Sequence, residues 1–96
     1  ESQVILNGSY NINFTMDLVL KDTGLFDDLA KKLNAPLEIS PKVVEIFKDG
    51  QKKYGSRAWS SMIVKRMEDL NNIDFRASGF PSELTDNEPE EKGYEI

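Results

Sequence analysis

Residues 13–36 read NFTMDLVLKDTGLFDDLAKKLNAP, and this stretch decides the fold. At about 100° per residue, its large apolar side chains fall on one helical stripe about 60° wide, made of Phe14, Leu18, Leu25 and Leu29. The pattern predicts a helix over 13–33. The helix should end before Pro36, because a proline disfavours helical geometry at the residue that precedes it. We expect the stripe to face a core.

Lys21 lies at one edge of this stripe, and Asp22 lies just beyond the other edge. A cation in that place must reach water, a carboxylate or a ligand, because burying an unpaired charge is very costly. Two interpretations follow. Lys21 either lays its methylenes along the stripe and pairs with Asp17, or stands at the edge of a cleft and holds an anionic or polar ligand. Helical periodicity does not choose between them.

Ser40-Pro41 predicts the start of a second helix over 41–54, with Ser40 as the N-cap and Pro41 at the first helical position. Gly50 lies on its apolar face and suggests a close helix crossing, while Gly55 is typical of a left-handed helix stop. That apolar face consists of Val43, Phe47, Gly50 and Tyr54.

A third helix is expected over 57–70, with Ser56 as a candidate cap. Its inward positions are Trp59, Met62, Ile63, Met67 and Leu70. Residues 1–11 read as a lead-in with a turn at Asn7-Gly8. The fold class predicted from these patterns is all-α, with a three-helix region over 1–70 and an extended acidic tail over 71–96.

The acidic balance of the chain comes from that tail. The net charge is −5, yet residues 1–70 hold ten acids and ten bases, whereas residues 71–96 hold seven acids and two bases. Proline and glycine interrupt any regular element in the tail, so we expect its apolar side chains to order it by packing on the helices or on a neighbouring subunit. Those side chains are Phe75, Phe80, Leu84, Tyr94 and Ile96.

Composition excludes several functional classes. The chain has no cysteine and no histidine, which removes disulfides, thiolate zinc sites and the commonest general base, so we predict no metal site and no catalytic residue in these 96 residues. An acidic chain without a basic stripe is a poor nucleic-acid binder. No apolar run approaches the roughly 20 residues of a membrane span, and we expect no membrane partner.

One set of residues resembles a known family. The run from Phe14 through the Lys21-Asp22 pair to Pro36 is similar to the C-terminal domain of the β-hydroxyacid dehydrogenases, and most similar to 3-hydroxyisobutyrate dehydrogenases. The stretch Ile5-Leu6-Asn7-Gly8-Ser9-Tyr10 resembles the family's approach to this helix. Tyr54-Gly55 and Trp59-Ser60-Ser61 resemble its turn and the start of its last helix.

The resemblance implies an enzyme that transfers hydride between NAD or NADP and a small hydroxyacid. The helical domain of such an enzyme is like the C-terminal domain of 6-phosphogluconate dehydrogenase. This chain would be the last part of that helical domain. Lys21 would contact the cofactor near the nicotinamide, Asp22 would orient that lysine, and Phe14 would line the substrate cleft. A cytoplasmic location is expected, or the mitochondrial matrix in a eukaryote.

The resemblance also implies partners for the chain. It lacks a Gly-x-Gly-x-x-Gly loop, so most of the cofactor site and the catalytic lysine would lie in a Rossmann domain and a long helix before Glu1. We therefore expect the chain alone to be inactive and the enzyme to be a homo-oligomer. The alternative is a stand-alone acidic helical module that binds another protein, and a glycine-rich loop encoded upstream would exclude it.

Overall fold

The computed structural model describes residues 1–83 and 85–93. Their regular elements are α1 (Ser2–Leu6), α2 (Met16–Lys32), α3 (Ser40–Tyr54), the 3-10 helix η1 (Ser60–Met62) and α4 (Ile63–Asn71). Within these residues the β-type pairing is a single antiparallel bridge between Thr15 and Trp59. The predicted all-α class is therefore confirmed, whereas the packing predicted for Leu84, Tyr94 and Ile96 lies outside the described residues.

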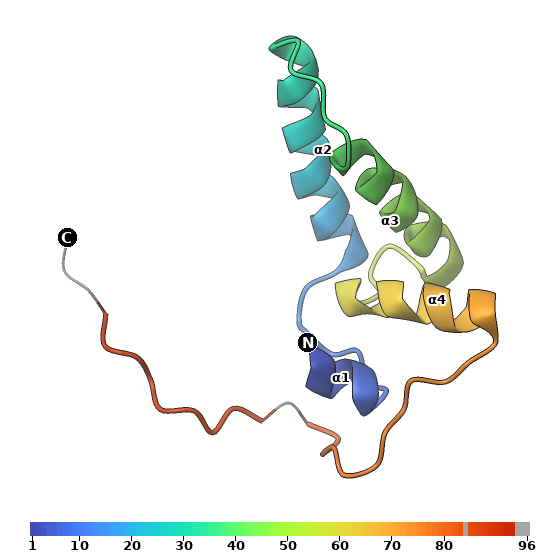
Figure 1. The fold of residues 1–96 in the computed structure, drawn as a ribbon, viewed down its shortest axis with the longest axis vertical. Coiled ribbons are helices and arrows are strands. Elements are labelled where there is room, and N and C mark those ends of the chain that lie inside the picture. Colours follow the sequence, from blue (N-terminus) through green and yellow to red (C-terminus); the bar gives the residue numbers. More distant parts are fainter. Residues whose placement is uncertain (84, 94–96) are drawn as a thin grey trace.

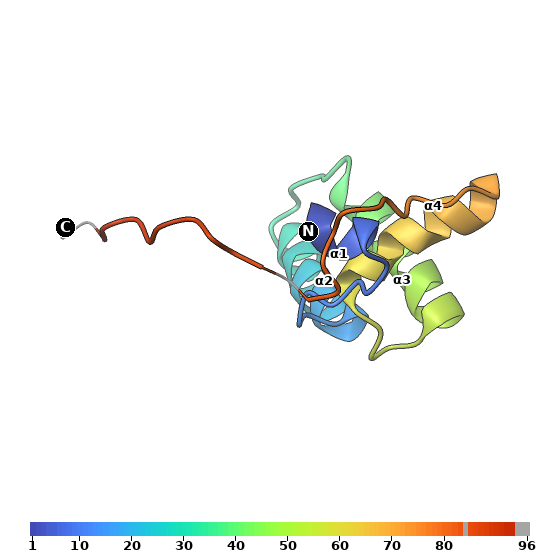
Figure 2. The same ribbon diagram turned by 90° about the horizontal axis from the view of Figure 1, so that it is seen from below.

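The two long helices lie side by side and run in opposite directions (Figure 1). α4 crosses near the first turns of α2 and the end of α3, and α1 lies beyond it (Figure 1). After α4 the chain returns past α1 and then extends away from the helices (Figures 1 and 2). The Cα radius of gyration is 16.5 Å, against about 12–13 Å for a compact domain of this length, because of that extension.

The contact between α2, α3 and α4 depends on a glycine. Gly50 is buried, and a Cβ atom there would lie 2.8 Å from Ile63 Cδ1 and 3.2 Å from Met16 Sδ. Met16 itself is fully buried. The absence of a side chain at Gly50 therefore lets the three helices meet, which confirms the predicted close crossing.

The predicted starts of the first and third helices are wrong for one shared reason. Asn13 is left-handed, with φ of 59°, and the chain then runs extended through Thr15 to the first residue of α2. The Met16 N–H donates to the Ala58 carbonyl over 2.9 Å, and the Ser60 N–H donates to the Phe14 carbonyl over 2.7 Å. These backbone bonds between two extended segments replace helical ones, so α2 begins at Met16 and residues 57–59 are not helical.

Several predicted helix ends also need correction. Ser40 is the first residue of α3, and Ile39 occupies the N-cap without a side-chain hydrogen bond. Gly55 ends α3 with φ of 102° and ψ of 153°, which is a positive-φ stop but not the left-handed helical one. Ser56 caps no helix, because its hydroxyl accepts a hydrogen bond from the Gln51 side chain. The lead-in contains the short α1, which the sequence patterns did not reveal, and Gly8 forms the predicted turn with φ of 82°.

The apolar stripe predicted to face a core is exposed. α2 packs on α3 through a different face that includes Met16, Asp27 and Ala30. Leu25 and Leu29 are 63% and 54% exposed, and Phe14 and Leu18 are also exposed. On α4, Met67 and Leu70 are likewise exposed, whereas Glu68 is buried. Within the described residues, α2 therefore has two apolar faces and buries only one.

Hydrogen bonds to α1 hold the first part of the tail. The Ala77 N–H donates to the Leu6 carbonyl over 3.0 Å. The Asn7 amide donates to the Pro81 carbonyl over 2.8 Å, and the Gln3 amide donates to the Thr85 carbonyl over 2.8 Å. Of the predicted apolar anchors, Phe75 is half-buried but Phe80 is exposed. The described tail is thus fixed mainly by polar contacts to α1.

Candidate functional site

Lys21 projects from the middle of α2 into solvent. Its side chain is 62% exposed, and its Nζ lies 3.6 Å from Oδ1 of Asp22, which is 61% exposed. An ion pair this exposed contributes little to stability, about 0–1 kcal/mol. The structure therefore brings the two predicted site residues together, and it keeps the ammonium group accessible to a ligand.

Of the two interpretations of Lys21, the one in which it pairs with Asp17 does not agree with the structure. The Asp17 carboxylate accepts hydrogen bonds from the Thr15 hydroxyl and from the Leu18 N–H. Its second oxygen lies 3.6 Å from the Arg57 guanidinium. The Thr15 hydroxyl is the largest cause that lowers the pKa of Asp17 below its ordinary value, and Arg57 adds to it. Asp17 thus contacts the residues at the start of α2 and Arg57, and it does not pair with Lys21.

Lys21 lines a groove of about 420 Å³ between α2 and α3. Three lysines and three aspartates contribute to the groove, so it is polar and of mixed charge. Such a surface can hold a polar ligand through charge-assisted hydrogen bonds, which are about twice as strong as neutral ones. The charged lining residues are Asp17, Lys21, Asp27, Asp28, Lys31 and Lys48.

The third predicted site residue lies apart from this groove. Phe14 precedes α2 in the extended segment, where its carbonyl accepts the Ser60 N–H. Neither Phe14 nor Asp22 lines the groove that contains Lys21. The structure thus places Phe14 at the exposed approach to α2, and the predicted three-residue site is not one closed cavity in this chain.

Neither a metal site nor a membrane-spanning helix is found in the part of the chain that the structure describes. There, no three side chains of the acidic, histidine or cysteine types gather closely enough to hold a metal ion. None of the described helices has both the length and the apolar character needed to cross a bilayer.

Sequence patterns missed a polar cluster formed by the buried Tyr10 and Glu68 and the more exposed Arg76, which we call the tail clasp. Tyr10 donates from its hydroxyl to Oε1 of Glu68 over 2.5 Å. Arg76 donates from Nη2 to Oε2 of Glu68 over 2.9 Å and from Nη1 to the Ile5 carbonyl over 2.9 Å. Its guanidinium carbon lies 4.8 Å from the centre of the Tyr10 ring, within the range of a cation–π contact.

The clasp joins the start of the chain, α4 and the tail. Burial, followed by the hydrogen bond to Glu68, raises the pKa of Tyr10 to about 12. Gly8 leaves room for the arginine, since a Cβ there would lie 2.8 Å from Arg76 Cδ. The one signal in the sequence was a lone arginine in an otherwise acidic segment. All three side chains hydrogen-bond one another, so the clasp holds these three segments together.

Comparison with known proteins gives one match. The family model described as the NAD-binding domain of NADP-dependent 3-hydroxyisobutyrate dehydrogenase matches residues 2–67. The match includes Phe14, Lys21 and Asp22, and it ends within α4, before the Arg76 part of the clasp. No curated protein and no solved structure matches the chain.

Proposed function

Because this chain belongs to the family of 3-hydroxyisobutyrate dehydrogenase-like NAD-binding helical domains, we propose that it forms one wall of the active-site cleft of an NAD(P)-dependent 3-hydroxyacid dehydrogenase. A dinucleotide-binding Rossmann domain of the same enzyme forms the opposite wall and holds most of the cofactor. The substrate is a small hydroxyacid, and the hydride acceptor is NAD or NADP.

The observation that carries this proposal is the accessible Lys21 ammonium group in a family-matched segment. Its only ion-pair partner among the described residues is the adjacent, equally exposed Asp22. A ligand can therefore take up the ammonium without breaking a buried contact. We assign to Lys21 a contact with the bound cofactor near its nicotinamide, and to Asp22 the orientation of Lys21. Phe14 lines the substrate side of the cleft.

The exposed apolar face of α2 supports a second part of the proposal. Phe14, Leu18, Leu25 and Leu29 are all exposed beside Lys21. Leu18, Leu25 and Leu29 share one face of α2, whereas Phe14 lies just before the helix. Exposed apolar side chains gathered on one helix face are typical of a face that another protein segment covers. In the enzyme, other helices of the same domain or of a second subunit cover it, and this places the edge carrying Lys21 next to the cleft.

The chain by itself is proposed to be inactive. Its sequence contains no glycine-rich phosphate loop and no histidine. Lys21 can bind and orient, but the proton transfer that accompanies hydride transfer belongs to a group outside these residues. Purified chain should therefore give no nicotinamide reduction at any concentration, and a rate that scales with chain concentration would contradict this.

The test is Lys21→Ala in the intact enzyme that contains this chain. Loss of one charge-assisted contact of about 1.5–3 kcal/mol predicts a ten- to hundredfold weaker cofactor affinity or kcat/KM. The matched control is Lys32→Ala, which removes an α2 lysine that does not line the groove. Equal kinetics for Lys21→Ala, Lys32→Ala and the parent enzyme, with unchanged melting temperatures, would refute the assignment of Lys21.

A further inference from the structure

A second cavity lies where α2 ends and α3 begins, and it shares Asp27 and Lys31 with the groove that Lys21 lines. It has a volume of about 520 Å³, within the range of about 300–1,000 Å³ that small-molecule sites occupy. Its walls are the last turns of α2, the connection to α3 and the first turn of α3. The lining residues are Asp27, Ala30, Lys31, Asn34, Ala35, Pro36, Leu37 and Pro41.

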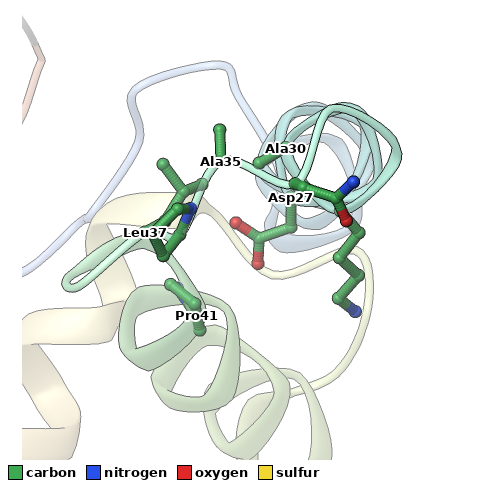
Figure 3. A pocket seen from close by; sticks show the side chains of 8 residues that line it. Asp27, Ala30, Ala35, Leu37 and Pro41 are labelled. Atoms are coloured by element: carbon green, nitrogen blue, oxygen red, sulfur yellow. The ribbon is translucent and has the colours of Figure 1, made fainter.

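One buried carboxylate opens into this cavity. Asp27 is only 9% exposed, although it carries an acid on the face of α2 that packs on α3. Figure 3 shows the carboxylate directed into the space between Ala30, Leu37 and Pro41. The Ser40 hydroxyl donates to Oδ1 over 2.5 Å, and across residues 1–83 and 85–93 the structure gives Oδ2 no hydrogen-bond partner.

Among the described residues no buried side-chain oxygen lacks a hydrogen-bond partner, so Oδ2 is open to the cavity and can accept a hydrogen bond from a donor there. Lys31 lies one turn later on α2 and lines the same cavity. Its Nζ forms no ion pair with Asp27 within 4.0 Å in the described structure, so the two charges are neighbours but are not joined. The cavity thus has one acidic and one basic residue in its lining.

The rest of the wall is apolar. Leu37 and Pro41 lie across the cavity from the Asp27 carboxylate (Figure 3). The other apolar lining residues are Ala30 on α2 and Ala35 and Pro36 in the connection. Prolines hold their backbone dihedral angle fixed, so this wall loses little conformational entropy when a ligand orders it. A branched aliphatic group fits the chemistry of such a wall.

We propose that this cavity binds a small apolar amino acid. The ligand's ammonium group pairs with the free oxygen of Asp27, its carboxylate pairs with Lys31, and its aliphatic side chain lies against Pro36, Leu37 and Pro41. Both charged groups of an α-amino acid lie on one carbon, so one small ligand carries a partner for the acid and a partner for the base that line this cavity. This inference does not depend on the function proposed for Lys21.

The experiment follows backbone amide shifts of the ¹⁵N-labelled full chain during titration with L-leucine. Two matched probes test the two charged groups of leucine one at a time. Isopentylamine lacks the carboxylate, and 4-methylpentanoate lacks the ammonium group. We expect shifts centred on residues 27–41 with leucine, and at least tenfold weaker binding of either probe. Absence of shifts with leucine up to about 10 mM, or equal affinity for isopentylamine, would overturn the proposal.

Variants locate the site. Asp27→Asn keeps an acceptor for Ser40 but removes the charge, and we expect it to weaken leucine binding at least tenfold. Asp28→Asn is the matched control, because Asp28 is exposed and does not line this cavity. Lys31→Gln replaces an exposed side chain and should weaken leucine but not isopentylamine, which keeps the test valid if Asp27→Asn is unstable. Lys21→Ala should leave leucine affinity unchanged, so this proposal and the cofactor proposal can fail separately.

Discussion

Arg76 donates a hydrogen bond over 2.9 Å to the carboxylate of Glu68, which is buried on α4. The family match ends within α4 at residue 67, so both residues of this pair lie beyond it, and the pair joins the end of α4 to the tail. The Glu68 side chain is 5% exposed, and the arginine is its charged partner. The tail is therefore part of the folded unit as far as this contact reaches.

Removal of the arginine should destabilise the chain. Arg76→Ala leaves the Glu68 carboxylate buried without its cation, and the loss of a hydrogen bond between charged groups predicts a fall of about 1.5–3 kcal/mol in unfolding free energy. Arg57→Ala is the control, because Arg57 is 86% exposed in its 3.6 Å pair and should cost under about 0.5 kcal/mol. Urea denaturation measures both, and equal stability of the two variants would show that the clasp does not hold the tail.

Truncation should separate two parts of the tail. Deletion of residues 72–96 removes Arg76 and the hydrogen bonds to α1, so it should lower stability at least as much as Arg76→Ala. Deletion of residues 86–96 keeps every described contact with α1 and should leave the urea midpoint unchanged. Light scattering on the same samples tests the predicted subunit contact, which requires the mass to fall in one of the truncations.

Alkaline pH should lower the unfolding free energy of the chain through Tyr10. The pKa of Tyr10 is raised to about 12 in the folded chain, from 10.0. The stability that its protonated hydroxyl adds is therefore fully present below the unfolded-state pKa of 10.0, and it is lost as the pH rises from 10.0 to about 12. Unfolding free energy should therefore fall over this interval, and it should fall less steeply in Tyr10→Phe. Tyr54→Phe is the comparison, because its pKa is also raised to about 12 but its hydroxyl bonds the exposed Asp69. A parallel decline in Tyr10→Phe and the parent chain would contradict the prediction.

Two glycine substitutions should have opposite signs. A Cβ atom added at Gly24 would meet no other group within 4 Å, so Gly24→Ala should stabilise α2 by about 0.5–1 kcal/mol through helix propensity. Gly50→Ala gains the same propensity but forces Ile63 and the fully buried Met16 to move, and such overpacking costs about 1–3 kcal/mol. Thermal unfolding of both variants checks this, and a higher melting temperature for Gly50→Ala would show that the crossing tolerates a methyl group.

Local sequence patterns predicted the positions of the helices well, but they predicted poorly which parts of the chain contact or cover each helix. Proline at position 41 and the break at 34–36 fixed α3 and the end of α2 to within a residue or two, because these are properties of the chain next to them. The start of α2 was missed because its first N–H bonds Ala58, more than forty residues away. Periodicity identified the Phe14 stripe as apolar, but it does not reveal whether anything covers a stripe.

In the candidate site too, a short motif was enough to predict some features, whereas others depend on how distant parts of the chain pack. Lys21 and Asp22 were found from a short motif and do lie together, whereas the groove beside Lys21 depends on how α3 lies against α2. The clasp was invisible because Tyr10 is separated from Glu68 and Arg76 by 58 and 66 positions, and because none of the three lies on an apolar helical stripe. Asp27 carried no signal of its burial, since a buried acid looks like a solvated one in a sequence.

The bond between Gln3 and Thr85 closes a loop of 82 positions, whereas α2 and α3 are joined by a short connection. Contacts between distant parts of a chain form slowly, because loop-closure entropy opposes them until other structure has formed. We therefore expect α2 and α3 to pair early in folding and the contact between α1 and the tail to form last. During synthesis on a ribosome, α1 would emerge before α2, α3 and α4, and it would have to wait for its partner until Thr85 has followed them.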